Sequence, residues 1–356
     1  MDKKLIIILT VIGLLWGFGL SLYFYPQSES TSTSAVAVLS VAKPLPISTQ
    51  NQTPVTTSTS TTTPVTILAF GDMMLDRGVR EKINTFGPEY PFALIKDFLK
   101  GDGNANDIVV TNAEGPFTDN PSVTLGIKNA PLQFTFDPAM LSTLKNLGFT
   151  LLDQANNHSL NFGLTDFDQS TTSITATGLN WFGDPRNEFV KPYITDIRGE
   201  KVAFIGYNEF AYHGLNNILQ AIKNTKTNST FVVVYSHWGI EYDSNATTSQ
   251  EKAAHAFIDV GADVVIGSHP HVIQPIEVYK NKPIFYSLGN FIFDQPADAP
   301  TGRGLAIKIS LTSNLVTYGL FPISIKNEQA SLMTDEDRQK ILDNLGVQNA
   351  EIKLPR

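Results

Sequence analysis

Short apolar runs, each ending in a polar or charged group, recur along the chain from Val65 onward. Continuous runs of this kind are typical of strands that are buried on both faces. They occupy residues 65–70, 107–111, 149–154, 230–235 and 263–266. Between them lie stretches with the period of an amphipathic helix, at residues 91–99, 137–147, 164–177, 215–223 and 249–260. The alternation of strands and helices predicts an α/β domain.

The pattern changes after His271. Apolar runs at residues 272–279, 284–288, 304–311 and 315–325 follow one another without helical stretches between them, which predicts antiparallel strands. Thr334 is suited to cap a short helix at residues 336–345. We therefore expect a main domain at residues 65–326 and a C-terminal helical extension at residues 327–356.

The N-terminal residues 1–26 predict a membrane anchor. Lys3 and Lys4 precede an uncharged apolar run at residues 5–25, and a helix of this length would be roughly 30 Å long, the thickness of the hydrocarbon core. A cleaved signal peptide is the competing interpretation, but the run is long and no small-x-small site follows it directly. The lysines place the N-terminus in the cytoplasm and the rest of the chain outside the cell membrane, as a single-pass protein.

Residues 27–64 form a different kind of segment. Ser, Thr and Pro dominate it, and Glu29 and Lys43 are its only charged residues. Such a composition buries too little apolar surface to offset the entropy lost on folding. The segment is therefore predicted to be a disordered linker, with an end-to-end distance of roughly 35 Å, that holds the domain clear of the membrane.

Charge and composition narrow the range of partners. The net charge is −8 and the chain has no dense Lys/Arg run. Nucleic acid is therefore not expected as a partner, because phosphate backbones are bound by clustered cations. An anionic substrate would instead be held by a few local cations or by metal ions. The absence of cysteine excludes disulfides, thiolate metal sites and thiol catalysis.

Candidate chemistry lies at the carboxyl ends of the predicted α/β strands. These ends carry Asp72, Glu114, Asn157-His158, His237 and His269-Pro270-His271. Ligands of α/β sheets bind outside the carboxyl ends of strands, so these groups are expected to meet in one crevice. Carboxylate, amide and imidazole ligands without thiolate suit Mn, Fe, Zn or Mg. The set predicts a divalent-metal site, and a carboxylate bridging two metals would suit ester or phosphoester hydrolysis.

Most of these groups also have a plainer interpretation. Asp72 could belong to a turn or a helix cap, Glu114 could be a solvated loop acid, and Asn157 could cap the next turn. His237, which stands beside Trp238, could be a hydrogen-bonded core histidine. None of these residues, taken singly, indicates a metal site.

The pair His269 and His271 is harder to explain as ordinary structure. Alternation around a single residue lets both imidazoles approach the same metal pair, and imidazole is the commonest metal ligand. His158 directly follows the candidate ligand Asn157. It is therefore the candidate general acid, or the group that stabilises developing charge.

Several segments resemble, in order, the motifs of the CapA family. They are Gly71-Asp72-Met73-Met74-Leu75-Asp76-Arg77, Asn112-Ala113-Glu114-Gly115-Pro116, Ala155-Asn156-Asn157-His158, His237-Trp238-Gly239-Ile240-Glu241-Tyr242, and the block from Ser268-His269-Pro270-His271 to Tyr286-Ser287-Leu288-Gly289-Asn290-Phe291. The resemblance covers roughly residues 65–325. It implies the four-layer αββα sandwich of the calcineurin-like, or metallophosphatase-like, superfamily. It also implies a role in poly-γ-glutamate capsule synthesis and export in bacteria.

The resemblance further implies roles for individual residues. Metal contacts would come from Asp72, Glu114, Asn157, His237, His269 and His271, with His158 near the reacting group. Met74 stands where related phosphatases have a ligand His, and Glu114 replaces a bridging Asp; both changes are typical of the CapA branch. Asn161-Phe162-Gly163 stands where the family usually has Asp-Tyr-Gly, a change expected to alter a contact behind the ligands or the substrate preference. Ser268 stands where the family often has another His.

Further residues are candidates for substrate binding, namely Arg77, Trp238, Glu241 and Asn290. Arg77 could bind an anionic substrate, or it could be a solvated arginine at a helix start. Trp238 and Glu241 could shape the pocket beside His237, although a core position is the better interpretation for Trp238. Asn290 could bind a ligand or end its strand.

Three hypotheses for function follow from these observations. The first is a membrane-anchored extracytoplasmic CapA-like protein in the synthesis or export of poly-γ-glutamate or a related surface polymer, with other capsule-synthesis membrane proteins as partners. The second is a surface metal-dependent hydrolase that acts on phosphoesters. The third is a non-catalytic binding module that keeps the fold without bound metal.

Overall fold

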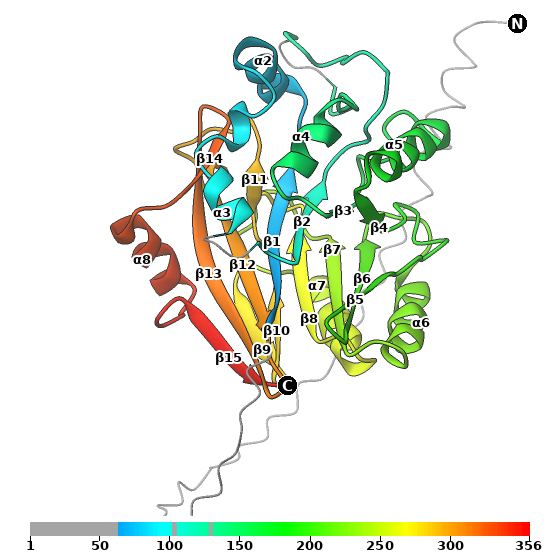
Figure 1. Ribbon diagram of the computed structural model, residues 1–356, viewed down its shortest axis with the longest axis vertical. Helices are drawn as coiled ribbons and strands as arrows, with labels where there is room; N and C mark the ends of the chain where they lie inside the picture. Colours follow the sequence, from blue (N-terminus) through cyan, green and yellow to red (C-terminus); the bar gives the residue numbers. More distant parts are fainter. Residues whose placement is uncertain (1–62, 102–104, 128–130) are drawn as a thin grey trace, which may run out of the picture. The chain divides into compact units, whose positions relative to one another are not determined.

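Two β-sheets lie face to face in the computed structural model, which describes residues 63–101, 105–127 and 131–356 (Figure 1). In the larger sheet the strand order is β14-β13-β12-β1-β2-β3-β4, with β11 paired to β1 and β15 paired to β13. Its strands are β1 (Val65–Met73), β2 (Ile108–Ala113), β3 (Leu151–Asp153), β4 (Asn180–Phe182), β11 (Asn290–Ile292), β12 (Arg303–Leu311), β13 (Leu315–Lys326), β14 (Gln329–Leu332) and β15 (Glu351–Pro355).

The smaller sheet has the order β5-β6-β7-β8-β10-β9. Its strands are β5 (Tyr193–Ile197), β6 (Glu200–Asn208), β7 (Phe231–His237), β8 (Val264–Ser268), β9 (Ile276–Tyr279) and β10 (Lys282–Phe285). β6, β7, β8 and β10 run parallel to one another, whereas β5 and β9 pair antiparallel at the two edges. The smaller sheet therefore has a parallel centre.

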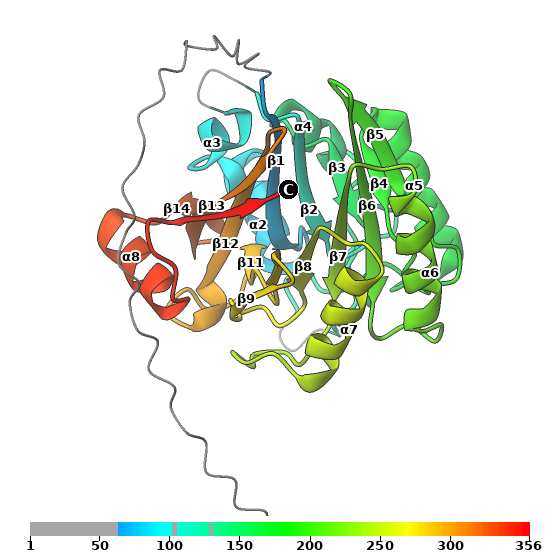
Figure 2. The ribbon, with the colours of Figure 1, turned by 90° about the horizontal axis from the view of Figure 1, so that it is seen from below.

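Helices cover the outer face of each sheet. Those on the larger sheet are α2 (Arg77–Phe86), α3 (Lys96–Lys100), α4 (Met140–Asn146) and α5 (Leu164–Thr177), with a 3-10 turn at Tyr90–Phe92. Those on the smaller sheet are α6 (Leu215–Lys226) and α7 (Thr248–Asp259). A second 3-10 turn, Pro300–Gly302, precedes β12, and α8 (Asp335–Asn344) lies beside β13. Figure 2 shows α3 and α4 on one side of the paired sheets and α7 on the other.

Three apolar clusters separate these layers, and β1 shows how one strand serves two of them. Leu68 and Phe70 pack toward the helices of the larger sheet, while Ile67 and Ala69 pack between the sheets. Alternate side chains of a strand point to opposite faces, and both faces of β1 are covered. The continuous apolar run that predicted a buried strand therefore has a direct physical cause. The mixed α/β class is confirmed.

Helix predictions succeeded where an apolar stripe or a cap was present. α5 spans Leu164–Thr177, the predicted range, and α7 begins with a capping box in which Thr247 and Gln250 bond to each other's backbone. The helix α2 was not among the predicted helices, although Val79, Ile83 and Phe86 follow one another at helical spacing. Of these three, Val79 is buried, Ile83 packs partly against the core and Phe86 is exposed.

The helix predicted within the C-terminal extension at residues 327–356 is present, but the prediction missed that the extension also contributes strands to the larger sheet. α8 is present, but β14 and β15 flank it in sequence and both pair antiparallel with β13. Asn327 and Glu328, with φ of 51° and 60°, form the tight turn between β13 and β14. The strands are short and alternate between apolar and polar residues, so they give no apolar run. The segment completes the larger sheet.

The predicted anchor at residues 1–26 and nearly all of the predicted linker at residues 27–64 lie outside the described residues. Among the helices that the structure describes, none is both long enough and apolar enough to cross a membrane. The anchor and the linker stay predictions from the sequence.

Candidate metal centre

The carboxyl ends of strands from both sheets meet at one place. In the larger sheet, parallel β1 and β2 pair Asp72 with Asn112, two residues before Glu114. In the smaller sheet, parallel β7 and β8 pair His237 with Ser268, directly before His269. The backbone N–H of His269 donates to Oδ2 of Asp72 at 3.0 Å, which joins the two sheets at this point.

Asp72, Glu114 and His271 form the candidate metal-binding group. Their ligand atoms all lie within 4.8 Å of one another. Nε2 of His271 is 3.7 Å from Oε1 of Glu114, and its Nδ1 is 3.4 Å from Oδ2 of Asp72. All three side chains are buried. The structure therefore brings together two carboxylates and one imidazole from three separate motifs.

Asp72 and His271 stabilise each other as an ion pair. Burial alone would raise the pKa of Asp72, but His271 and the donors from Asn112 and His269 hold it below its ordinary value. Burial alone would lower the pKa of His271, yet the charges of Glu114 and Asp72 raise it to about 9. In the metal-free protein at neutral pH, Asp72 is therefore negative and His271 positive. A metal would have to displace a proton from His271, because only the neutral imidazole is a ligand.

Glu114 is less well supported, because only the charge of His271 opposes the effects of burial and of Asp72 on its pKa. Neither of its carboxylate oxygens accepts a hydrogen bond from any described residue, and the side chain is 1% exposed. Burial first, and the charge of Asp72 second, raise its pKa well above the ordinary value. A buried carboxylate without donors is expensive to ionise unless a cation neutralises it. The environment of Glu114 therefore suits an ionised carboxylate better when a cation is bound than in the metal-free protein.

A second set of nitrogen and oxygen atoms lies beside the first. Nε2 of His237 is 2.9 Å from Oδ1 of Asn157, and the ring of His269 lies 4.7 Å from that of His237. Nδ1 of His269 has no hydrogen-bond partner among the described residues. Burial, helped by the charge of His271, lowers the pKa of His269 to about 4, and burial also lowers that of His237. Both rings are therefore neutral at pH 7, the form that binds metals.

The backbone at the His-Pro-His segment is strained. His269 and His271 have φ of 93° and 59°, in the region that side-chain-bearing residues rarely adopt. Such residues typically cost about 1–3 kcal/mol each and cluster at functional sites. In this conformation the backbone N–H of His269 points at Asp72 and the ring of His271 points at Glu114.

His158 lies at the edge of this group, with Nε2 3.8 Å from Oε1 of Glu114. Its Nδ1 is 3.1 Å from Oδ1 of Asn161, which also accepts the backbone N–H of Phe134 at 2.6 Å. Because that contact fixes Oδ1 as an acceptor, Nδ1 of His158 must be the donor. Burial lowers the pKa of His158, and the contact with Asn161 opposes this. Neutral His158 then presents the lone pair of Nε2 toward Glu114.

Asn161→Asp is expected to raise the pKa of His158. The carboxylate would accept the same two donors and add a negative charge beside Nδ1, which favours the protonated ring by about 1–3 pKa units. The pKa of His158 can be followed by NMR titration of its ring protons, with Asn161→Ser as the uncharged control. A pKa in the Asp variant equal to or below that in the Ser variant would contradict this account.

Two asparagines to which the sequence motifs assigned no role organise the centre. Nδ2 of Asn112 donates to Oδ1 of Asp72 at 2.7 Å and lies 3.2 Å from Nδ1 of His237. Asn156 donates to Oδ1 of Asn112 and accepts the N–H groups of His158 and Ser159. The cap predicted for Asn157 is thus made by Asn156. One signal was present in the sequence, since Asn112 is an amide near the end of a buried strand that begins with three apolar residues.

Trp238 is a core residue, which is the interpretation that the sequence favours, and it does not have the substrate-binding role that was its alternative. The side chain is fully buried, its Nε1 donates to the carbonyl of Tyr286, and its ring stacks on Phe257 of α7. It belongs to the core between the smaller sheet and its helices. Trp238 directly follows His237, the last residue of β7, and therefore points to the opposite face of the sheet.

The other candidates for substrate binding lie around the centre in different roles. Oδ1 of Asn290 is 3.0 Å from Nδ1 of His271, and its Nδ2 donates to Gln295 and to the carbonyl of Thr301, so it holds the imidazole. The Nε of Arg77 is 3.1 Å from Oδ2 of Asp294. Glu241 is partly exposed, and its charge raises the pKa of Glu114. Substrate contacts by Arg77 and Glu241 stay predictions.

The fold and the centre define a mixed α/β protein with a candidate divalent-metal site of carboxylate and imidazole groups between two sheets. The family model of the bacterial capsule synthesis protein PGA_cap matches residues 66–295, and the chain belongs to this family. The capsule biosynthesis protein CapA of Bacillus anthracis is 33% identical over 253 residues, 65% of this chain and 60% of that protein. The PGA biosynthesis protein CapA of Bacillus subtilis strain 168 is 32% identical over 246 residues, 63% of this chain and 62% of that protein. The match thus spans about three fifths of either relative's length.

Among solved structures, the chain is similar to a hypothetical protein from Thermus thermophilus, with a TM-score of 0.44 and 16% identity over 72% of this chain and 99% of that one. It is also similar to the purple acid phosphatase PPD1 from yellow lupin seeds. That similarity has a TM-score of 0.35 and 11% identity, over 70% of this chain and 53% of the phosphatase.

Proposed function

We propose that the protein acts in the synthesis or export of poly-γ-glutamate or a related anionic surface polymer. The observation that carries this proposal is the family match, since residues 66–295 contain every residue of the candidate centre. The names of the two Bacillus relatives, which concern capsule and PGA biosynthesis, support it.

The proposal includes a place for the protein in the cell. An uncleaved N-terminal helix at residues 1–26 would anchor it in the cell membrane with the N-terminus in the cytoplasm, and the linker would hold the domain outside. In this arrangement the domain has the metallophosphatase-like four-layer αββα fold, and other capsule-synthesis membrane proteins are its partners. The lysines before the apolar run support the orientation.

The residues of the centre fit a divalent cation, because the two oxygens of Glu114 have no donor and Nδ1 of His269 has no partner among the described residues. The proposed ligands are Asp72, Glu114, Asn157, His237, His269 and His271. A bound Mn, Fe, Zn or Mg ion, or a pair of ions, would act as a Lewis acid toward an ester or phosphoester. Neutral His158 would keep its proton on Nδ1 and would accept a proton at the edge of the centre through Nε2, the imidazole nitrogen that faces Glu114, and later return it.

Two observations favour different outcomes for catalysis. The carboxylate of Glu114 lies beside His271 and has no hydrogen-bond donor among the described residues. This favours an active hydrolase, so a surface metal-dependent phosphoesterase is the second candidate function. Met74 favours a binding module, because its side chain is buried in the apolar core and its sulfur accepts the N–H of Asp76 at 3.0 Å. It therefore offers no ligand where related phosphatases have a histidine.

Deleting the gene in its host and measuring surface polyglutamate tests the proposal. We expect the polymer to be lost, and to be restored by the wild-type gene but not by Glu114→Gln. Unchanged polymer after deletion would refute the capsule function. Turnover of a panel of phosphomonoesters and diesters by the metal-loaded full chain, abolished by His269→Ala with His271→Ala, would then favour the phosphoesterase.

A further inference from the structure

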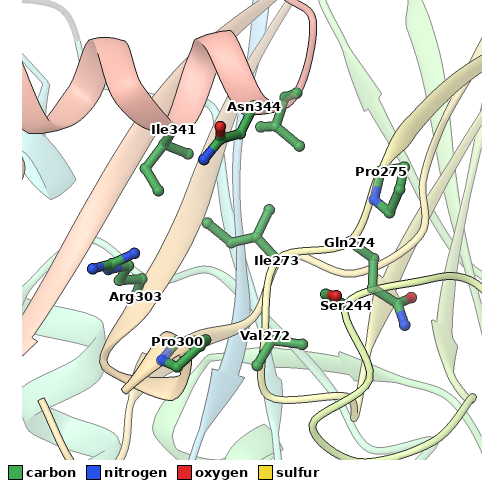
Figure 3. A pocket seen from close by; sticks show the side chains of 10 residues that line it. Ser244, Val272, Ile273, Gln274, Pro275, Pro300, Arg303, Ile341 and Asn344 are labelled. Carbon is green, nitrogen blue, oxygen red and sulfur yellow. The ribbon is translucent and has the colours of Figure 1, made fainter. Parts of the chain in front are cut away.

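A hollow of about 260 Å³ lies between α8, the start of β12 and the segment that follows His271 (Figure 3). Ile341 and Asn344 of α8 stand on one side, with Pro300 and Val272 opposite, Arg303 at one end and Pro275 at the other. None of the residues that line it belongs to the candidate metal centre. Pockets for drug-sized ligands measure about 300–1,000 Å³, so this hollow suits a smaller ligand or a single unit of a chain.

Among the described residues, Arg303 is the only charged one that lines the hollow. Its guanidinium makes no ion pair or hydrogen bond with any described residue, and the same holds for the side-chain amide of Asn344. Gln274, by contrast, is fully engaged, because its Nε2 donates to the carbonyls of Asp243 and Asn245 and its Oε1 accepts from Gln250. Arg303 and Asn344 therefore have free donors for an anion, and no carboxylate of the described lining competes for them.

The rest of the lining is mainly apolar. Ile273, Ile341 and Leu345 provide aliphatic surface next to the two donors. A second hollow shares Arg303, Ile341 and Asn344, but it is also lined by Asp298, Asp337 and Asp343 together with Lys326 and Lys340. These mixed charges make the second hollow a poor site for an anion. The first hollow combines one free guanidinium with aliphatic walls.

We propose that this hollow binds an aliphatic carboxylate. The carboxylate accepts hydrogen bonds from Arg303 and Asn344, and the methylene stem lies against Ile273 and Ile341. Charge-assisted hydrogen bonds to a guanidinium are strong and suit the two oxygens of a carboxylate. The ligand is either a free dicarboxylate or amino acid, or one unit of a carboxylate-bearing chain. The site lies outside the metal centre; a free carboxylate as its ligand does not depend on the function proposed above, whereas a chain as its ligand rests on that function.

Calorimetric titration of the full-length chain in the presence of a chelator tests this site, because the chelator keeps carboxylates from binding through a metal ion. We expect glutarate to bind. Glutaramide should bind much more weakly because it lacks the negative charge, and inorganic phosphate should do so because it lacks the methylene stem. Arg303→Gln should weaken glutarate binding by about 10- to 100-fold, as expected for the loss of a hydrogen bond to a charged group. A γ-linked glutamate tetramer that binds more tightly than glutarate would identify a chain as the ligand, whereas equal affinities would identify the free group.

Lys326→Gln is the matched control, because it removes one exposed positive charge that lines the second hollow but not the first. It should leave the glutarate affinity unchanged, while Arg303→Lys should retain part of it. The proposal is overturned if glutarate does not bind, if Arg303→Gln binds it as the wild type does, or if Lys326→Gln weakens binding as much as Arg303→Gln.

Discussion

Glu114→Gln is expected to abolish stoichiometric metal binding and to leave the metal-free protein at least as stable as the wild type. Even residues behind the ligands change metal affinity about 10- to 100-fold when they are mutated, and Glu114 is a member of the candidate ligand group itself. We therefore expect a loss of more than about 100-fold. Metal content after equilibrium dialysis of the full chain, determined by elemental analysis, measures this effect.

The stability of the metal-free protein should depend on pH through the same residue. The folded-state pKa of Glu114 lies well above its ordinary value of 4.5. Its contribution to the free energy of unfolding is therefore fully present below about pH 4.5 and is lost as the pH rises through the folded-state pKa. The Gln variant lacks this loss, so its stability relative to the wild type should increase with pH.

Urea unfolding of both metal-free proteins at several pH values measures this difference. Glu336→Gln is the control for metal content, since Glu336 is an exposed carboxylate in the first turn of α8 and is not among the candidate ligands. Metal binding by Glu114→Gln at the wild-type level would show that Glu114 is not a ligand. A stability difference that stays constant with pH would show that Glu114 is not the buried acid inferred here.

The parts of the fold that the sequence predicts well are those in which burial itself creates the pattern. β1, β2, β7 and β8 are covered on both faces, so nearly every residue in them is apolar and each strand is visible alone. β14 and β15 pair along only part of the long strand β13 and carry polar residues at alternate positions. Their alternation is a strand signal, but over four or five residues it is too short to be distinctive, and their position depends on pairing with β13.

The convergence of the candidate site was predictable for a similar reason. Polar groups at the ends of parallel strands must lie at the same edge of a sheet, and Asp72, Glu114, His237 and His271 obey this rule. The contacts made by each side chain depend on register and on the face of the strand, which a single sequence does not specify. That is why Asn112, which contacts both Asp72 and His237, was given no role, and why Trp238 was kept as a candidate for the pocket beside its core interpretation.

Gly71→Ala is expected to destabilise the protein by more than about 3 kcal/mol, because overpacking a core typically costs about 1–3 kcal/mol even when side chains can move aside. Here the obstacle is backbone. A Cβ at position 71 would lie 1.9 Å from the carbonyl oxygen of Gly289. The same oxygen accepts the backbone N–H of Asp72 at 3.1 Å. An alanine would therefore push apart two segments that position a candidate ligand.

The effect should reach the metal centre as well as the fold, because β11 pairs Asn290 with Asp72 and Asn290 holds His271. Urea unfolding and metal content of the full chain measure the two effects separately. Gly214→Ala is the matched control, since a Cβ there has nothing within 4 Å and φ is −94°; loss of its helix-capping preference should cost about 1 kcal/mol. A Gly71→Ala variant that is no more destabilised than Gly214→Ala would contradict this account. It would show that the close approach of β1 to residue 289 does not fix the position of Asp72. If instead Gly71→Ala loses metal affinity together with stability, a glycine is required at position 71. The backbones of residues 71 and 289 must then be in contact for Asp72 to reach the other candidate ligands.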